Sequence, residues 1–288
     1  MNFRENLGII AIISSFILVN ILFLSSYNDV WWDSSVYIGM GKYIYSFGKS
    51  GLWEESRPLI FPLILGLGYL LDLNLVYFGR IVSLAFAVLV LIMVYKIGTK
   101  LFSKKAGLIA AFFTAFSYTF FFFSSNILTE ISSTFFVLLA FYFFIEGRFF
   151  LVGLFSGIAV MTRLFQIFTL IGLGLVFIYY FWNKPNFSKK LIGILAGASI
   201  FILPYVLLNY YLYKDILLPF KVQAHLTQST GWMLYKDYGF YFVDLLKENF
   251  FVAVLLLLPF FFKKNYKFFA LVLTPLTYIF IFSFVSHK

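Results

Sequence analysis

The amino-acid sequence predicts an all-α polytopic membrane protein. Of its 288 residues, 62% are hydrophobic and only 12% are charged, and the mean hydropathy is +0.94. A soluble domain cannot hide that much apolar surface in one core. The apolar residues also form continuous runs, not the alternating pattern of a membrane β-barrel. We therefore expect one transmembrane domain over residues 1–288, built from helices that cross the bilayer.

Nine apolar runs are predicted to span the membrane, and a tenth is too short to do so. The first run is too long for a signal peptide and lacks a small-residue cleavage pattern. The short run, Pro58–Leu71, reaches about 21 Å as a helix, less than a hydrocarbon core of about 30 Å. It is predicted to be a juxtamembrane helix that returns to the side it left. The nine spans are Leu7–Ser26, Tyr77–Ile97, Ala106–Phe123, Ile131–Ile145, Phe149–Met161, Leu164–Trp182, Leu191–Tyr211, Phe250–Phe262 and Phe268–Val285.

The basic residues predict the orientation of the chain. With the N-terminus in the cytoplasm, the N-terminal segment and the loops "KIGTKLFSKK", "EGR", "NKPNFSKK" and "KKNYK" all face that side. They hold 12 of the 22 Lys and Arg residues but only 2 of the 12 acids, as the positive-inside rule expects. This distribution of basic residues holds only if Pro58–Leu71 does not cross the membrane. The net charge of +10 thus reflects membrane topology, and no nucleic-acid partner is predicted.

The composition also limits the chemistry. The chain has no Cys and only two His, so it offers neither a disulfide framework nor a thiolate metal site. No metal ligands are predicted. Candidate site residues are therefore sought among the acids and arginines of the extracytoplasmic segments, chiefly residues 27–57 and 212–249.

Asp33 lies in the first extracytoplasmic segment, within "DVWWDSSVYIGMGKYI". From Asp33 to Tyr45 the pattern predicts an amphipathic helix on the membrane, with aromatic rings at headgroup depth. A carboxylate there is close to water and within reach of a lipid-borne group. The alternative is that Asp33 caps the helix by accepting a backbone N–H from Ser35 or Val36.

Two arginines lie near the short apolar run. Arg57 immediately precedes it, with Pro58 in the N1-like position, so its charge and the positive helix end would form an anion site. The alternative is an interfacial anchor. Arg80 lies near the outer end of the next predicted span, where a structural pairing with Asp72 is favoured.

Glu130 and Arg163 are charges at the edges of apolar runs. Glu130 lies at the outer lip of a predicted span, where an acid is costly unless it is paired or functional. Its alternative role is a first-turn acid that complements the helix dipole. Arg163 is the only charge from Phe149 to Phe181, so it needs an anionic partner, either a protein carboxylate or a lipid phosphate. Its alternative role is a snorkelling interfacial arginine.

The terminal pair His287 and Lys288 meets the extracytoplasmic face again. Under the predicted topology Asp33, Arg57, Glu130, Arg163 and His287 all fall on this one face. Two acids and several cations on the same face predict a site that binds a phosphate at the membrane surface and holds a base.

The order of these motifs over residues 2–182 resembles the GT-C superfamily of polyprenyl-phosphate-sugar-dependent glycosyltransferases. The protein O-mannosyltransferase and aminoarabinose-transferase-like families are the most similar. The terminal "HK" is similar to the start of an "HKE-x-R" motif of related mannosyltransferases, so the usual C-terminal region is expected to be missing. The matching positions are Asp33 with Tyr37, Arg57 with Pro58, Arg80, Glu130, and the Gly-rich segment with Gly153, Gly157, Thr162 and Arg163.

The resemblance implies a GT-C-type helix bundle with juxtamembrane helices in the first extracytoplasmic loop. It implies transfer of a sugar, such as mannose or another hexose, from a polyprenyl-phosphate donor such as a dolichyl phosphate. The acceptor would be a protein, lipid or glycan on the extracytoplasmic face of the cell membrane, and the anomeric carbon would be inverted. Glu130 would be the second catalytic residue, which orients the acceptor or a bound divalent cation (Mg²⁺ or Mn²⁺). The implied roles are catalytic base for Asp33, lipid-phosphate binding for Arg57, Arg163 and Lys288, and support for Tyr37, Arg80 and His287.

The alternative hypothesis is that the protein is a non-catalytic membrane protein, namely a lipid flippase, a transporter or an assembly subunit. A transporter places paired charges near the bilayer midplane and often shows repeated halves. The sequence has no internal repeat, and its polar residues gather at one surface, which favours the transferase.

Overall fold

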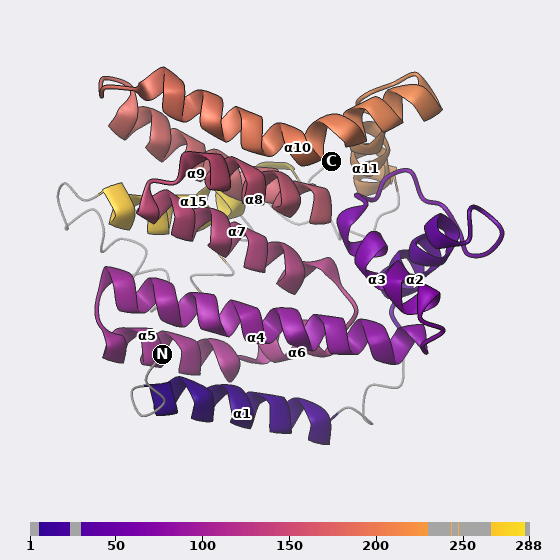
Figure 1. The fold of residues 1–288 in the computed structure, drawn as a ribbon, viewed down its shortest axis with the longest axis horizontal. Coiled ribbons are helices and arrows are strands. Elements are labelled where there is room, and N and C mark those ends of the chain that lie inside the picture. Colours follow the sequence, from indigo (N-terminus) through magenta and orange to yellow (C-terminus); the bar gives the residue numbers. More distant parts are fainter. Residues whose placement is uncertain (1–5, 24–29, 230–242, 244–246, 248–265, 286–288) are drawn as a thin grey trace. The chain divides into compact units, whose positions relative to one another are not determined.

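The computed structural model describes residues 6–23, 30–229, 243, 247 and 266–285, and all regular secondary structure within them is helical (Figure 1). The predicted all-α class is therefore confirmed. Among the described residues, three helices are long and apolar enough to cross a membrane: α4 (Leu75–Leu101), α7 (Thr129–Glu146) and α10 (Phe187–Tyr213). Five shorter apolar helices accompany them.

Most predicted spans coincide with single helices. The Phe250–Phe262 span lies outside the described residues, and the total of nine spans stays a prediction. The short helix α3 (Ile60–Leu70) occupies the predicted juxtamembrane run, although it begins two residues after Pro58, so Pro58 is not at N1. The helices that match predicted spans are α1 (Leu7–Leu22), α4, α7, α8 (Phe149–Thr162), α9 (Gln166–Phe181), α10 and α15 (Tyr266–Val285).

The predicted span Ala106–Phe123 is not one continuous helix. It is divided into α5 (Lys104–Ala115) and α6 (Tyr118–Ser125), which are bent by 63°. Ser117 causes the break, because its extended backbone begins α6 and its hydroxyl accepts from the Phe120 N–H at 3.3 Å. The apolar run is unbroken in hydropathy, so composition alone does not reveal this cap.

The chain forms two compact units. The first contains residues 1–142 and 161–163, and the second contains residues 143–160 and 164–288. In the first unit α1, α4 and α5 run alongside one another (Figure 1). Their shared core is formed by Phe16 of α1, Leu91 of α4 and Ala115 of α5, all at most 1% exposed.

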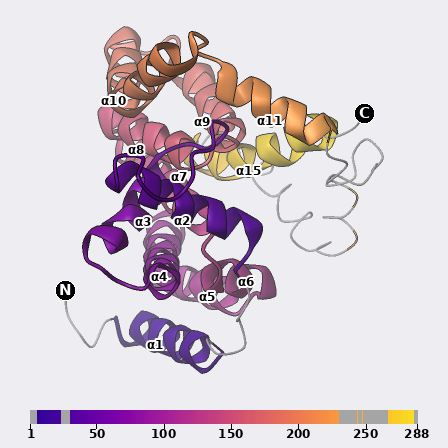
Figure 2. The same ribbon diagram turned by 90° about the vertical axis from the view of Figure 1, so that its right-hand side faces the viewer.

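A second core in the first unit holds α2 (Trp32–Tyr45) against α3, and Figure 2 shows these two helices side by side. It is formed by Tyr37, Phe61, Leu65 and Ile127. The two backbones approach closely at Gly41, where an added Cβ would lie 2.8 Å from both the Gly66 nitrogen and the Pro62 oxygen. Only glycine fits there, and this approach fixes the position of α2, which carries Asp33.

In the second unit, α8 and α10 pack through glycines. A Cβ on Gly157 would lie 2.8 Å from the Ala198 oxygen, and the Gly153 position is tighter still. These two small residues let the backbones of α8 and α10 approach closely. Gly172 of α9 allows a similar approach to α15, because an added Cβ would lie 2.6 Å from the Leu273 oxygen.

Replacing Gly153 with alanine is expected to destabilise the protein, since the new Cβ would lie 1.8 Å from the backbone oxygen of Ile194. Overpacking of this kind costs about 1–3 kcal/mol. The matched control is Gly174→Ala on α9, where nothing lies within 4 Å of the added Cβ. That change should be neutral or stabilising, because alanine favours a helix by about 1 kcal/mol over glycine. Thermal unfolding in detergent measures both, and equal melting temperatures for the two variants would contradict the close helix contact.

Candidate active site

The first two site residues lie on one face of α2. This helix begins at Trp32 with Trp31 as its N-cap residue, so Asp33 is in the first turn. Tyr37 follows four residues later and therefore points to the same side as Asp33. The helix predicted from Asp33 to Tyr45 is confirmed, and its position on the membrane surface stays a prediction. Its alternative role as the N-cap residue is wrong, because the helix begins one residue earlier and the Asp33 carboxylate binds an arginine.

That arginine is Arg57, which lies just before α3. Its Nη2 atom is 2.6 Å from Asp33 Oδ1, and its Nη1 atom donates to the Tyr37 hydroxyl at 3.0 Å. The Nε atom donates to Glu54 Oε1 at 3.0 Å, and Ser56 Oγ donates to the same oxygen at 2.7 Å. All three nitrogens of the guanidinium therefore have partners, which fixes its orientation.

The charge of Arg57 is stabilised by this environment. Burial alone would lower its pKa, but the neighbouring Tyr37, Asp33 and Glu54 oxygens raise the pKa above its ordinary value overall. An arginine is already charged throughout the accessible pH range. Arg57 therefore remains a cation when another group replaces Asp33, Tyr37 or Glu54 as its partner.

A second ion pair joins Arg163 to Glu130. Arg163 follows α8, and Glu130 lies in the first turn of α7. Their Nη1 and Oε1 atoms are 2.5 Å apart, and the same Nη1 donates to Thr129 Oγ1 at 3.3 Å. Arg163 thus has the anionic partner that the sequence required. The other carboxylate oxygen, Glu130 Oε2, is buried and has no hydrogen-bond partner among the described residues.

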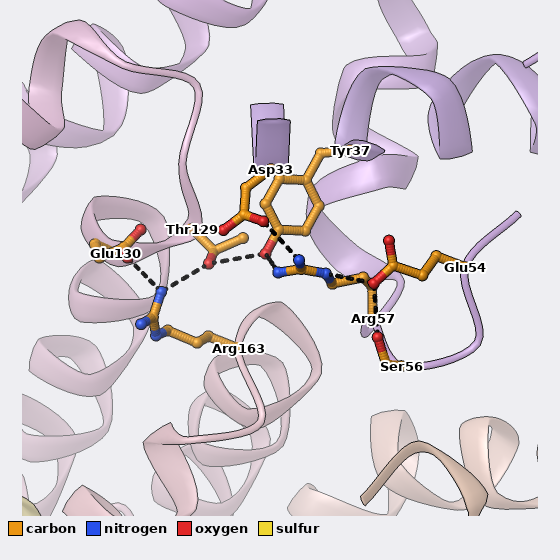
Figure 3. Close-up of polar contacts among 8 residues, drawn as sticks. All are labelled: Asp33, Tyr37, Glu54, Ser56, Arg57, Thr129, Glu130 and Arg163. Atoms are coloured by element: carbon orange, nitrogen blue, oxygen red, sulfur yellow. Dashed lines mark hydrogen bonds and ion pairs between the residues drawn. The ribbon is translucent and has the colours of Figure 1, made fainter. Parts of the chain in front are cut away.

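A pair of hydroxyl groups links the two arginines. Tyr37 Oη and Thr129 Oγ1 are 3.5 Å apart, and both side chains are nearly inaccessible, at 4% and 1% exposed. Figure 3 shows Arg57 and Arg163 reaching this pair from opposite sides. The eight residues drawn there form one polar network inside the first compact unit.

The network has three carboxylates, Asp33, Glu54 and Glu130, and two arginines. Both arginines are therefore neutralised by protein groups. Asp33 is the most exposed member of these ion pairs, with 45% of its side chain accessible against 20% for Arg57. Asp33 is therefore the carboxylate of this network that is most accessible from outside the protein.

The structure brings together five of the predicted site residues: Asp33, Tyr37, Arg57, Glu130 and Arg163. Arg80 lies in the second turn of α4 with a half-buried side chain and is not one of the residues drawn in Figure 3. His287 and Lys288 lie outside the described residues.

Three members of the network were not predicted: Glu54, Ser56 and Thr129. Glu54 and Ser56 form a local turn with Arg57 in "EESRP", and Thr129 directly precedes Glu130. Each of the three lies within three residues of a predicted site residue, and this nearness in sequence could have identified them. In the part of the chain that the structure describes, no group of three or more His, Asp or Glu residues could hold a metal ion.

Comparison with known proteins identifies the family. Neither a curated protein nor a solved structure matches the chain. Residues 56–210 match the sequence model of a family described as dolichyl-phosphate-mannose-protein mannosyltransferase. The match includes Arg57, Thr129, Glu130 and Arg163, whereas Asp33 and Tyr37 precede it. The members of this family, which is part of the GT-C superfamily, are membrane glycosyltransferases that use a polyprenyl-phosphate-linked sugar as donor. Because the match covers more than half of the chain, the protein belongs to this family.

Proposed function

We propose that the protein moves a hexose, such as mannose, from a polyprenyl-phosphate donor to a protein, lipid or glycan acceptor on the extracytoplasmic face. The observation that carries this proposal is the network of Figure 3. It joins an accessible carboxylate, Asp33, to two arginines that can hold a phosphate, and all three lie in one compact unit.

Asp33 acts as the general base in this proposal. Its carboxylate takes the proton from an acceptor O–H or N–H as the acceptor atom attacks the anomeric carbon. The new bond to the acceptor forms on the face opposite the departing phosphate, so the configuration is inverted. The bond between the anomeric carbon and the phosphate oxygen breaks, and its electron pair leaves with the lipid phosphate.

Arg57 and Arg163 stabilise the leaving phosphate. Negative charge grows on the phosphate as the sugar departs, and fixed cations stabilise that charge without reorganising. Guanidinium groups also match phosphate oxygens in geometry. Each arginine already binds a carboxylate, so the donor phosphate takes the place of that carboxylate on at least part of the guanidinium.

Glu130 Oε1 binds Arg163, and among the described residues Oε2 has no hydrogen-bond partner. The free oxygen, Oε2, is suited to accept a hydrogen bond from an acceptor hydroxyl or amide. In this proposal Glu130 therefore both positions Arg163 and orients the acceptor.

A transfer assay in membranes tests the proposal. Membranes that contain the protein are supplied with labelled polyprenyl-phosphate mannose, glucose or an arabinose-type donor, and label is measured in the protein, lipid and glycan fractions. We expect one donor to give label in one fraction, and none in membranes that lack the protein. Movement of intact donor across the bilayer with no labelled product from any donor would instead favour a flippase.

A further inference from the structure

We propose that Glu54 is a positioning residue, which holds Arg57 in place while Asp33 exchanges partners during the reaction. This inference rests on the proposed function. It concerns an acid that precedes the residues matched to the family and that forms no part of the mechanism above.

Arg57 binds two carboxylates of different origin. Asp33 comes from α2, 24 residues away in sequence, and binds Nη2. Glu54 comes from the same turn as Arg57, three residues earlier, and binds Nε. The two carboxylates thus occupy different nitrogens, and either bond can persist without the other.

Glu54 is held more firmly than Asp33. Its Oε1 accepts from Ser56 Oγ at 2.7 Å as well as from Arg57, and Ser56 is only 1% exposed. The Glu54 side chain is 27% exposed, against 45% for Asp33. Glu54, Ser56 and Arg57 therefore form a fixed local unit. Asp33 binds this unit from another helix and is more exposed than Glu54.

The reaction requires Asp33 to leave this ion pair. Asp33 Oδ1 lies 2.6 Å from Arg57 Nη2, and once this carboxylate has taken the proton of the acceptor it is neutral and no longer binds the guanidinium as an anion. Arg57 would then lose its anchor at the moment when it must meet the phosphate. Glu54 prevents this, because it remains bound to Nε while the Nη2 edge passes from Asp33 to the phosphate.

Loss of the Glu54 charge should therefore lower kcat without raising the KM for the donor. In Glu54→Gln, Asp33 becomes the only carboxylate on Arg57 and is held back from its role as base, so kcat falls by about tenfold, the effect of one charge-assisted hydrogen bond. Arg57 is also less neutralised, so it attracts the donor phosphate more strongly. The KM for the donor should stay constant or fall, which a purely structural defect would not produce.

The experiment measures kcat and donor KM for Glu54→Gln, Ser56→Ala and the control Glu55→Gln. Glu55 is the adjacent acid and is exposed. Ser56→Ala removes the support of Glu54 but no charge, so it should lower kcat less, also without raising KM. Glu55→Gln should match wild type.

Several results would overturn the inference: an unchanged kcat in Glu54→Gln, a donor KM that rises with the loss of kcat, or an equal loss in Glu55→Gln. If Glu54→Gln does not fold, an unchanged kcat in Ser56→Ala overturns it. Asp33→Asn separates this inference from the proposed function. Transfer that survives Asp33→Asn refutes the role of Asp33 as base in the proposed function, whereas an inactive Asp33→Asn beside a fully active Glu54→Gln refutes only the positioning role.

Discussion

Replacing Asp33 with asparagine is expected to abolish sugar transfer, with a loss of about 10²–10⁴-fold in initial rate, the usual contribution of a general base. Asparagine has the same shape, and its amide oxygen can still accept from Arg57. It cannot take a proton from the acceptor, however. The measurement is transfer of label from the donor in membranes that contain equal amounts of wild-type and variant protein.

Two controls separate loss of the base from loss of the fold. Asp72→Asn makes the same chemical change at an exposed turn before α4, where the positive φ of 52° suits asparagine as well as aspartate. It should leave the rate unchanged. Cross-linking of the donor lipid to Asp33→Asn should persist, because both arginines remain. Near-wild-type transfer by Asp33→Asn would remove this residue from the mechanism.

The helices and the composition of the site followed largely from the sequence. Continuous apolar runs located most helices, because a span must bury its whole length in lipid. Arg163 and Glu130 could be identified from the sequence because they are charges at the edges of these runs, and such charges are costly without partners. The structure pairs these two residues with each other.

The details that depend on polar side chains could not be read from hydropathy. Ser117 divides one apolar run into α5 and α6 through a single hydroxyl cap. Thr129 is an uncharged side chain in an apolar context, yet it connects Arg163 to Tyr37. The sequence can identify residues of this kind as polar, but only the packed backbone shows which groups they reach.

The first predicted extracytoplasmic segment illustrates the same limit. Asp33, Glu54 and Glu55 are similar acids in sequence, and all three lie in one predicted outer segment. Only the first two bind Arg57, because α2 packs against α3 at Gly41 and the turn at Ser56 directs Glu54 inward. The choice among neighbouring acids is therefore made by tertiary packing.

Replacing Arg163 with glutamine is expected to lower transfer by about 10²–10³-fold, the loss typical of removing one fixed group that stabilises developing negative charge. In the proposed mechanism, its cation is one of two that hold the leaving phosphate. The matched control is Arg148→Gln, an exposed arginine in the turn between α7 and α8, which should leave the rate unchanged. Initial rates at saturating acceptor, compared over a range of donor concentrations, measure the effect.

The same substitution also leaves Glu130 without its cation, so a loss of activity could come from a disturbed fold. Leaving this partly buried carboxylate unpaired costs about 1–3 kcal/mol of stability. The double variant Arg163→Gln/Glu130→Gln removes both charges and should recover the melting temperature. It should not recover transfer, because the phosphate still lacks its cation. If the double variant recovers both, Arg163 serves only to neutralise Glu130, and its role at the phosphate is refuted.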